Sequence, residues 1–148
     1  MSVHPNMLKA AKRLLNSTHR FASTDLLKRL PFMGSSELDD QPFGVIKLDD
    51  NGVILEYNTY ESILAQRKKE DVYGRLFFSE VAPCTNTPVF SGIFFHGVKH
   101  DDLGAFLSYI FAFKSNPTHV WIHMHRCPKT KSNWILVKKR SQGQNEPN

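Results

Sequence analysis

The chain has 148 residues, the size of a single domain that can bury an ordinary core without disulfides or metal, and a formal net charge of +5. Its eleven Phe, four Tyr and two Trp favour a packed fold that contains β-strands over a disordered chain. Two cysteines are present, no secretory signal begins the sequence and no apolar run approaches the length of a membrane span. We therefore expect a cytoplasmic protein with reduced thiols.

The positive charge is unevenly distributed. Residues 1–30 hold six Lys/Arg against one acid, Asp25, and residues 103–144 hold seven Lys/Arg and no acid. Such a surface can attract nucleic acid or an acidic partner, but no nucleic-acid-binding motif accompanies it. We therefore predict a solvated basic face, with neither nucleic acid nor a membrane as partner.

The first 41 residues are expected to form a helical extension. Apolar residues at helical spacing predict an amphipathic helix over residues 5–20. Ser23-Thr24-Asp25 offers an N-cap for a second helix over residues 25–30, and the polar residues 32–41 indicate a connector. Two short helices cannot make a core of their own, so we expect them to lie on a face of a sheet. A helix that binds a membrane surface or a partner is the alternative.

Residues 42–140 alternate between strand and helix signals in an order typical of an antiparallel α+β domain. Asp49-Asp50-Asn51-Gly52 predicts a hairpin turn, because these residue types tolerate positive φ. Asn116-Pro117 is expected to turn the chain, and the polar residues 141–148 indicate a disordered tail. The expected strands are residues 43–48, 53–58, 104–114, 118–127 and 133–140. The expected helices are residues 59–64, 68–73 and 88–100.

The segment Phe78-Ser79-Glu80-Val81-Ala82-Pro83-Cys84-Thr85 delivers a cysteine directly after a proline. Pro83 fixes its own φ and biases Ala82 toward an extended conformation. We therefore expect Cys84 to lie in an ordered loop.

Three polar residues upstream are candidates to share a site with Cys84. Tyr57 and Glu61 are four residues apart, so they lie on one side if the chain becomes helical just after the hairpin strand. Burial would raise the pKa of the Glu61 carboxyl and keep it protonated as a donor. With Arg67, these residues supply a phenol, a carboxylic acid and a fixed cation, which could surround one small polar ligand.

The segment Val81-Ala82-Pro83-Cys84-Thr85, preceded by Gly74-Arg75-Leu76-Phe77-Phe78, closely resembles the photoactive yellow proteins. This family consists of small blue-light sensors of the PAS type, and the resemblance runs from about Phe43 to Lys139. It implies a PAS fold over residues 42–140: a five-stranded antiparallel sheet with helices and a chromophore loop on one face. The N-terminal helical extension, residues 1–41, is left to cover the other face.

The resemblance also implies the roles of individual residues. Cys84 resembles the residue that carries a covalent 4-hydroxycinnamoyl (p-coumaric acid) chromophore as a thioester. Tyr57 and Glu61 resemble the pair that holds the chromophore phenolate, and Arg67 resembles the cation that screens the pocket from water. The expected walls of the pocket are Phe77, Phe78, Ala82, Pro83 and Phe111.

Two positions depart from the family pattern. Ala65 stands where the family usually has a threonine that bonds the tyrosine hydroxyl, and Ser115 stands where it usually has a methionine near the chromophore. That methionine is associated with fast return to the dark state, so slow dark recovery is expected here. The resemblance implies trans–cis photoisomerisation, proton transfer from Glu61 and movement of the N-terminal extension, with an unknown downstream signalling protein. The resemblance further implies that the protein is not an enzyme and that it is a monomer or a weak dimer.

Three alternatives stay open from the residues alone. The first is a PAS module without chromophore that binds another ligand or a protein. The second is an enzyme with Cys84 as nucleophile, which would need a histidine such as His96 or His100 nearby in the fold. The third is a metal site formed by His123, His125 and Cys127 on one face of a strand, although this spacing is poor for a closed tetrahedral site.

Overall fold

The computed structural model describes residues 3–15, 20–113 and 116–140. Two sequence predictions, the role of Ser115 and the disorder of residues 141–148, lie outside this range. Within it, no helix is both long enough and apolar enough to cross a bilayer.

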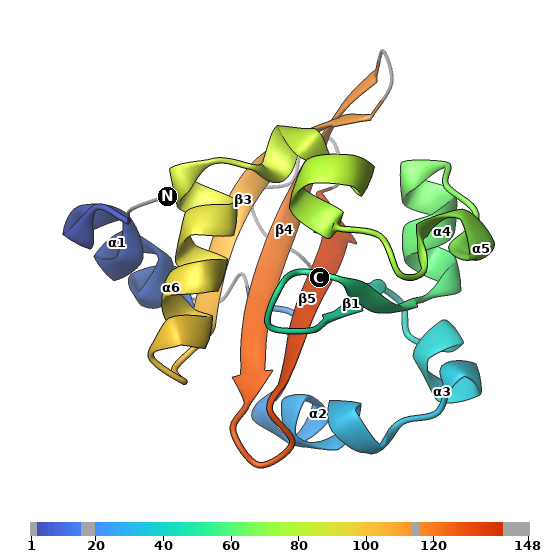
Figure 1. Ribbon diagram of the computed structural model, residues 1–148, viewed down its shortest axis with the longest axis horizontal. Helices are drawn as coiled ribbons and strands as arrows, with labels where there is room; N and C mark the ends of the chain where they lie inside the picture. The colour runs from blue at the N-terminus through green and yellow to red at the C-terminus, as the bar shows by residue number, and fades with distance from the viewer. Residues whose placement is uncertain (1–2, 16–19, 114–115, 141–148) are drawn as a thin grey trace.

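The centre of the fold is a five-stranded sheet with the order β2-β1-β5-β4-β3 (Figure 1). All neighbouring strands are antiparallel, which confirms the α+β prediction. The strands are β1 (Gly44–Leu48), β2 (Ile54–Tyr57), β3 (Gly104–Phe113), β4 (Asn116–Cys127) and β5 (Ser132–Lys139). Asn116 and Pro117 belong to β4, so the prediction that they form the turn was wrong. Their backbone pairs with the end of β3, and the strands continue further than the proline suggested.

Alternation along the strands gives the sheet two buried faces. On β5, Ile135 and Val137 belong to one core cluster, whereas Trp134 and Leu136 belong to a second. The first cluster also contains residues of the segment that carries Cys84. The second contains residues of the N-terminal extension.

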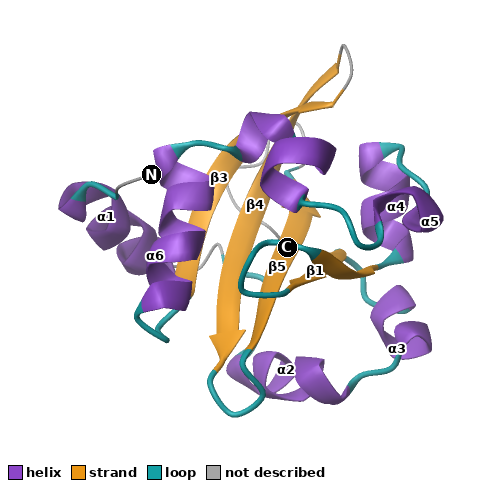
Figure 2. Cartoon of the chain, viewed as in Figure 1, coloured by secondary structure: helices purple, strands orange, loops and turns teal. Residues whose placement is uncertain are grey.

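The first face is covered by the elements between β2 and β3 (Figure 2). They are α4 (Thr59–Ala65), α5 (Lys69–Val72), a π-helical turn (Phe77–Val81), a 3-10 turn (Pro83–Thr85), a second π-helical turn (Pro88–Gly92) and α6 (Ile93–Lys99). The helix expected over residues 88–100 is therefore regular only from Ile93. The Ser91 hydroxyl donates to the Thr87 carbonyl at 3.0 Å, and the Gly92 N–H reaches the same oxygen at 3.0 Å, which widens this turn.

The second face is covered by α2 (Thr24–Arg29), a 3-10 turn (Leu30–Phe32) and α3 (Ser35–Asp39). The Ser23 side chain accepts a hydrogen bond from the Leu26 N–H at 3.0 Å, which confirms the predicted N-cap. The connector predicted over residues 32–41 contains α3. The sequence gives no helical periodicity there, because Leu38 alone anchors this short helix in the core.

Helix α1 (Pro5–Leu15) lies beside β3 (Figure 1). The prediction that the whole extension covers the second face was therefore wrong for this helix. Ala11 is 3 % exposed and belongs to the core cluster of the first face. The groove beside α1 is lined by both Leu107 and Ser108, neighbours on β3 that point to opposite faces. The helix therefore covers the edge of the sheet. Ile93 of α6 and Leu107 of β3 form an apolar surface at this edge, and the apolar face of the amphipathic helix α1 packs against it.

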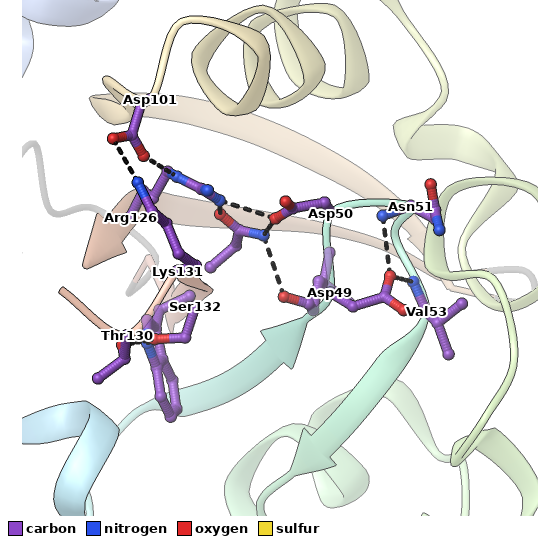
Figure 3. A network of polar contacts seen from close by, with 12 residues as sticks. Asp49, Asp50, Asn51, Val53, Asp101, Arg126, Thr130, Lys131 and Ser132 are labelled. Carbon is purple, nitrogen blue, oxygen red and sulfur yellow. Dashed lines mark hydrogen bonds and ion pairs between the residues drawn. The ribbon is translucent and has the colours of Figure 1, made fainter. Parts of the chain in front are cut away.

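A buried arginine joins three loops at one end of the sheet (Figure 3). The Arg126 side chain is 5 % exposed and donates to Asp50 at 2.7 Å, Asn133 at 2.7 Å and Asp101 at 2.6 Å. Lys131 adds an ion pair to Asp101 at 2.8 Å. The hydrogen bonds from Arg126 and Asn133 lower the pKa of Asp50. The β1–β2 turn, the α6–β3 loop and the β4–β5 hairpin are thereby held together.

Candidate functional site

A cavity of about 420 Å³ lies between α4, β3 and the loop that carries Cys84. It brings together most of the predicted site residues and adds two residues, Val81 and Ala112. Its lining residues are Tyr57, Glu61, Ala65, Arg67, Phe77, Val81, Ala82, Pro83, Cys84, Phe111 and Ala112. A space of this size suits a small organic molecule.

Tyr57 and Glu61 reach the cavity because the chain changes from strand to helix between them. Tyr57 ends β2, Asn58 is the N-cap of α4, and Glu61 lies in the first turn of that helix. Tyr57 is 2 % exposed and Glu61 is 1 % exposed. The four-residue spacing therefore places a phenol and a carboxyl group in one buried wall.

Asn58 fixes this strand-to-helix transition with both ends of its amide. Its Oδ1 accepts from the Glu61 N–H at 3.1 Å and the Val45 N–H at 2.9 Å. Its Nδ2 donates to the carbonyls of Leu38 at 2.8 Å and Phe43 at 2.9 Å. Asn58 was not predicted from the sequence, although the spacing of Asn58 and Glu61 is that of a capping box. Asn58 connects α4 directly to the N-terminal extension.

Glu61 is a buried carboxyl group whose Oε1 has no hydrogen-bond partner among the described residues. Burial raises its pKa to about 8, so the group is mostly protonated at neutral pH. Burial also raises the pKa of Tyr57, the charge of Glu61 raises it further, and Arg67 opposes both effects. Two uncharged O–H donors therefore face the cavity at pH 7.

Arg67 follows α4 after a left-handed residue, Gln66, with φ 54°. The Ser62 hydroxyl donates to the Arg67 carbonyl at 2.6 Å and fixes the backbone of this bend. The guanidinium is partly buried, and its Nη1 lies 3.4 Å from the Val81 carbonyl oxygen. A fixed cation thus borders the cavity. Ala65 also lines it, and its side chain offers no hydroxyl group to Tyr57.

Cys84 is a partly exposed free thiol in an ordered turn, as predicted. The Ala82 carbonyl accepts from the Thr85 N–H at 2.9 Å and from the Thr85 hydroxyl at 2.6 Å. The Tyr109 hydroxyl donates to the Cys84 carbonyl at 2.7 Å. Sequence reasoning missed Tyr109, although it shares strand parity with Phe111, which was placed in the pocket.

Phe78 is not among the residues that line the cavity, so its predicted place in the wall was wrong. Its ring lies 5.0 Å from that of Phe77, 5.6 Å from Phe90 and 5.2 Å from Phe94. Adjacent residues in a helical turn point in different directions. Phe77 therefore faces the cavity while Phe78 packs in the core behind it.

Two alternatives from the sequence lose support from this geometry. Within the described residues, no group of three or more His, Cys, Asp or Glu side chains could hold a metal ion, and His123 is buried against Phe106. The described residues that line the Cys84 cavity include no histidine. His96 and His100 lie against each other, with ring centroids 4.5 Å apart.

Known proteins resemble this chain over most of its length. No family model matches it. It is 42% identical over 120 residues to the photoactive yellow protein of Rhodothalassium salexigens, covering 81% of this chain and 96% of that protein. The crystal structure of the photoactive yellow protein domain of the sensor histidine kinase Ppr from Rhodospirillum centenum is 43% identical, with a TM-score of 0.73, and covers 76% of this chain and 99% of that domain.

A more distant structure shows the fold alone. The PAS domain of an HTR-like protein from Haloarcula marismortui is 12% identical, with a TM-score of 0.51, and covers 72% of this chain and 93% of that domain. The five-stranded antiparallel sheet with its helices is thus a PAS fold, as predicted. On the identity and coverage of its relatives, the chain belongs to the photoactive yellow protein family of PAS-type photoreceptors.

Proposed function

We propose that the chain is a blue-light photoreceptor in which Cys84 carries a 4-hydroxycinnamoyl group as a thioester. The observation that carries this proposal is the buried Glu61 carboxyl group, whose Oε1 has no hydrogen-bond partner among the described residues and which lines the Cys84 cavity together with Tyr57. Burial raises its pKa to about 8, which favours the protonated form at neutral pH. The bound group supplies the absorption of blue light and a double bond that isomerises from trans to cis. The cavity residues supply the anchor, the polar contacts and the proton.

Attachment needs an activated form of 4-hydroxycinnamic acid. The Cys84 thiol loses its proton to solvent and forms the S–C bond, and the activating group leaves with the bonding electrons. The partial exposure of Cys84 supports this role, because the reagent must reach the sulfur. Cys127 is also partly exposed, but it lies at the end of β4 and not in the cavity wall.

Tyr57 and Glu61 are the proposed donors to the phenolate of the chromophore. A hydrogen bond to a charged oxygen is worth roughly 1.5–3 kcal/mol, more than one to a neutral oxygen. Arg67 adds a positive charge at the border of the cavity, which favours an anion inside. The apolar residues Phe77 and Phe111 exclude water from the remaining walls.

Signalling would begin when Glu61 gives its proton to the phenolate in the light. The carboxylate that remains is buried, and an unpaired buried charge is costly. Asn58 bonds the Glu61 N–H and also the Leu38 carbonyl, so movement of α4 reaches the N-terminal extension directly. Rearrangement of residues 1–41 would then expose a surface to a downstream signalling protein.

Slow return to the dark state is part of the proposal. Ala65 is 6 % exposed and cannot bond the Tyr57 hydroxyl, so one contact that would hold the dark arrangement is missing. Ser115, the second departure from the family pattern, lies outside the described residues.

The test is an absorption spectrum and an intact mass after activated 4-hydroxycinnamic acid is added to purified apoprotein. We expect a visible band that bleaches in blue light and a mass gain of one hydroxycinnamoyl group on the peptide that contains Cys84. Cys84→Ser should abolish both, and Cys127→Ser is the matched control that should keep both. A colourless protein with an unmodified Cys84 would leave a PAS module without this pigment.

A further inference from the structure

Gly44 lies against the functional carboxyl group. It is the first residue of β1, opposite Val137 of β5. Positive φ occurs at Gly52 and Gly74 but not at Gly44, so its backbone does not require glycine. The restriction is space: a Cβ at position 44 would collide with Glu61 Oε1 and lie 3.2 Å from Glu61 Cβ and 3.3 Å from Val137 Cβ.

The backbone around Gly44 is fixed on both sides. The Phe43 carbonyl accepts from Asn58 Nδ2 at 2.9 Å, and the Val45 N–H donates to Asn58 Oδ1 at 2.9 Å. The same Oδ1 holds the first turn of α4 through the Glu61 N–H. The Asn58 side chain therefore joins β1 to α4 next to Gly44, and neither element can easily move away from an added methyl group.

The group that can move is the end of the Glu61 side chain. Its Oε1 has no hydrogen-bond partner among the described residues, and its carboxyl group borders the cavity. A methyl group at position 44 would therefore leave the sheet in place and push the carboxyl group toward the cavity.

We propose that Gly44 is a positioning residue of this photoreceptor, whose missing side chain gives Glu61 the place against β1 from which it donates its proton. This inference rests on the proposed function. Gly44→Ala should take up the chromophore, because Cys84 and its turn are untouched. The hydrogen bond from Glu61 to the phenolate should be lost or distorted.

Two properties of the pigment should change together in Gly44→Ala. Without one charge-assisted hydrogen bond, the apparent pKa of the chromophore phenol should rise by roughly one to two units. The absorption maximum should move to longer wavelength, since a hydrogen bond to the phenolate oxygen holds the negative charge there. Both are read from a pH titration of the visible band.

Two controls separate positioning from a general structural effect. Gly34→Ala adds the same methyl group where no atom lies within 4 Å of the new Cβ, and it should leave band and titration at parent values. In a Glu61→Ala background, Gly44→Ala should cause no further shift, because the group on which it acts is absent. Equal shifts in both backgrounds would overturn the inference, as would a pigmented Gly44→Ala with the parent's band and titration.

A measurement without pigment tests Gly44 separately from the chromophore. Carbon-13 NMR of the Glu61 carboxyl group in apoprotein should give a pKa of about 8 in the parent and a lower value in Gly44→Ala, whose carboxyl group is pushed toward the cavity. A parent that fails to bind the pigment refutes the proposed function, yet this titration still decides the role of Gly44. An unchanged Glu61 pKa in the variant refutes that role.

Discussion

Replacing Glu61 by Gln should remove a large pH dependence from the stability of the apoprotein. Burial raises the pKa of Glu61 from 4.5 to about 8, a rise of about 3.5 units. Each unit corresponds to 1.36 kcal/mol, so ionising Glu61 in the folded state costs up to about 5 kcal/mol. The pKa of Glu61 is higher in the folded state than in the unfolded state. The contribution of the neutral carboxyl group to stability is therefore complete below pH 4.5 and is lost as the pH rises through about 8.

The clearest window lies between about pH 6.5 and 8. Burial lowers the pKa of His123 from 6.5 to about 3. The contribution of the neutral imidazole to stability is therefore gained as the pH rises and is complete above 6.5. Between about pH 6.5 and 8, the ionisation of Glu61 should lower the free energy of unfolding by about 2 kcal/mol. Urea unfolding of parent and Glu61→Gln apoprotein measures this difference. Parallel pH profiles for the two proteins would refute the reasoning.

Three further outcomes follow from the structure and the family pattern. Arg126→Ala should lower the free energy of unfolding by about 2–4 kcal/mol, because buried Asn133 loses a charged partner; an unchanged urea midpoint would contradict this. Asn58→Ala removes four hydrogen bonds and should lower the free energy of unfolding by about 2–4 kcal/mol. Relative to the parent, amide exchange should accelerate more in α3 than in β4, and an equal acceleration in both elements would argue against a local role. Ser115→Met should speed dark recovery in flash photolysis, and an equal rate would remove Ser115 from the explanation.

Short-range rules in the sequence were sufficient for the sheet and for the Tyr57–Glu61 pair, whereas the walls of the cavity were implied by the resemblance to the photoactive yellow proteins. Strand alternation, the turn between β1 and β2 and the four-residue spacing of Tyr57 and Glu61 are local, and the structure keeps them. The raised pKa of Glu61 was also foreseeable in direction, because an apolar pocket always disfavours the charged form.

The errors concern how elements meet, which local patterns do not encode. An amphipathic helix such as α1 shows that it buries one side, but not whether that side meets a face or an edge of the sheet. Phe77 and Phe78 are chemically alike, and the sequence does not show which of the two packs against Phe94 of α6 and which faces the cavity. Gly44 looked like an ordinary strand residue, because its importance is the space it leaves for a side chain seventeen positions later.

The position of α1 has a consequence for solubility. β2 and β3 are the two edge strands of the sheet, and an uncovered edge invites strands from other molecules to add to it. On β2, the Ile54 N–H bonds the Arg75 carbonyl at 2.9 Å and the Ile54 carbonyl accepts from the Gly74 N–H at 2.9 Å, so this edge is partly paired. Helix α1 lies along β3 and presents lysines and an arginine outward. Over the part of β3 that it contacts, the same helix therefore hinders pairing with strands of other molecules, whether or not a pigment is bound.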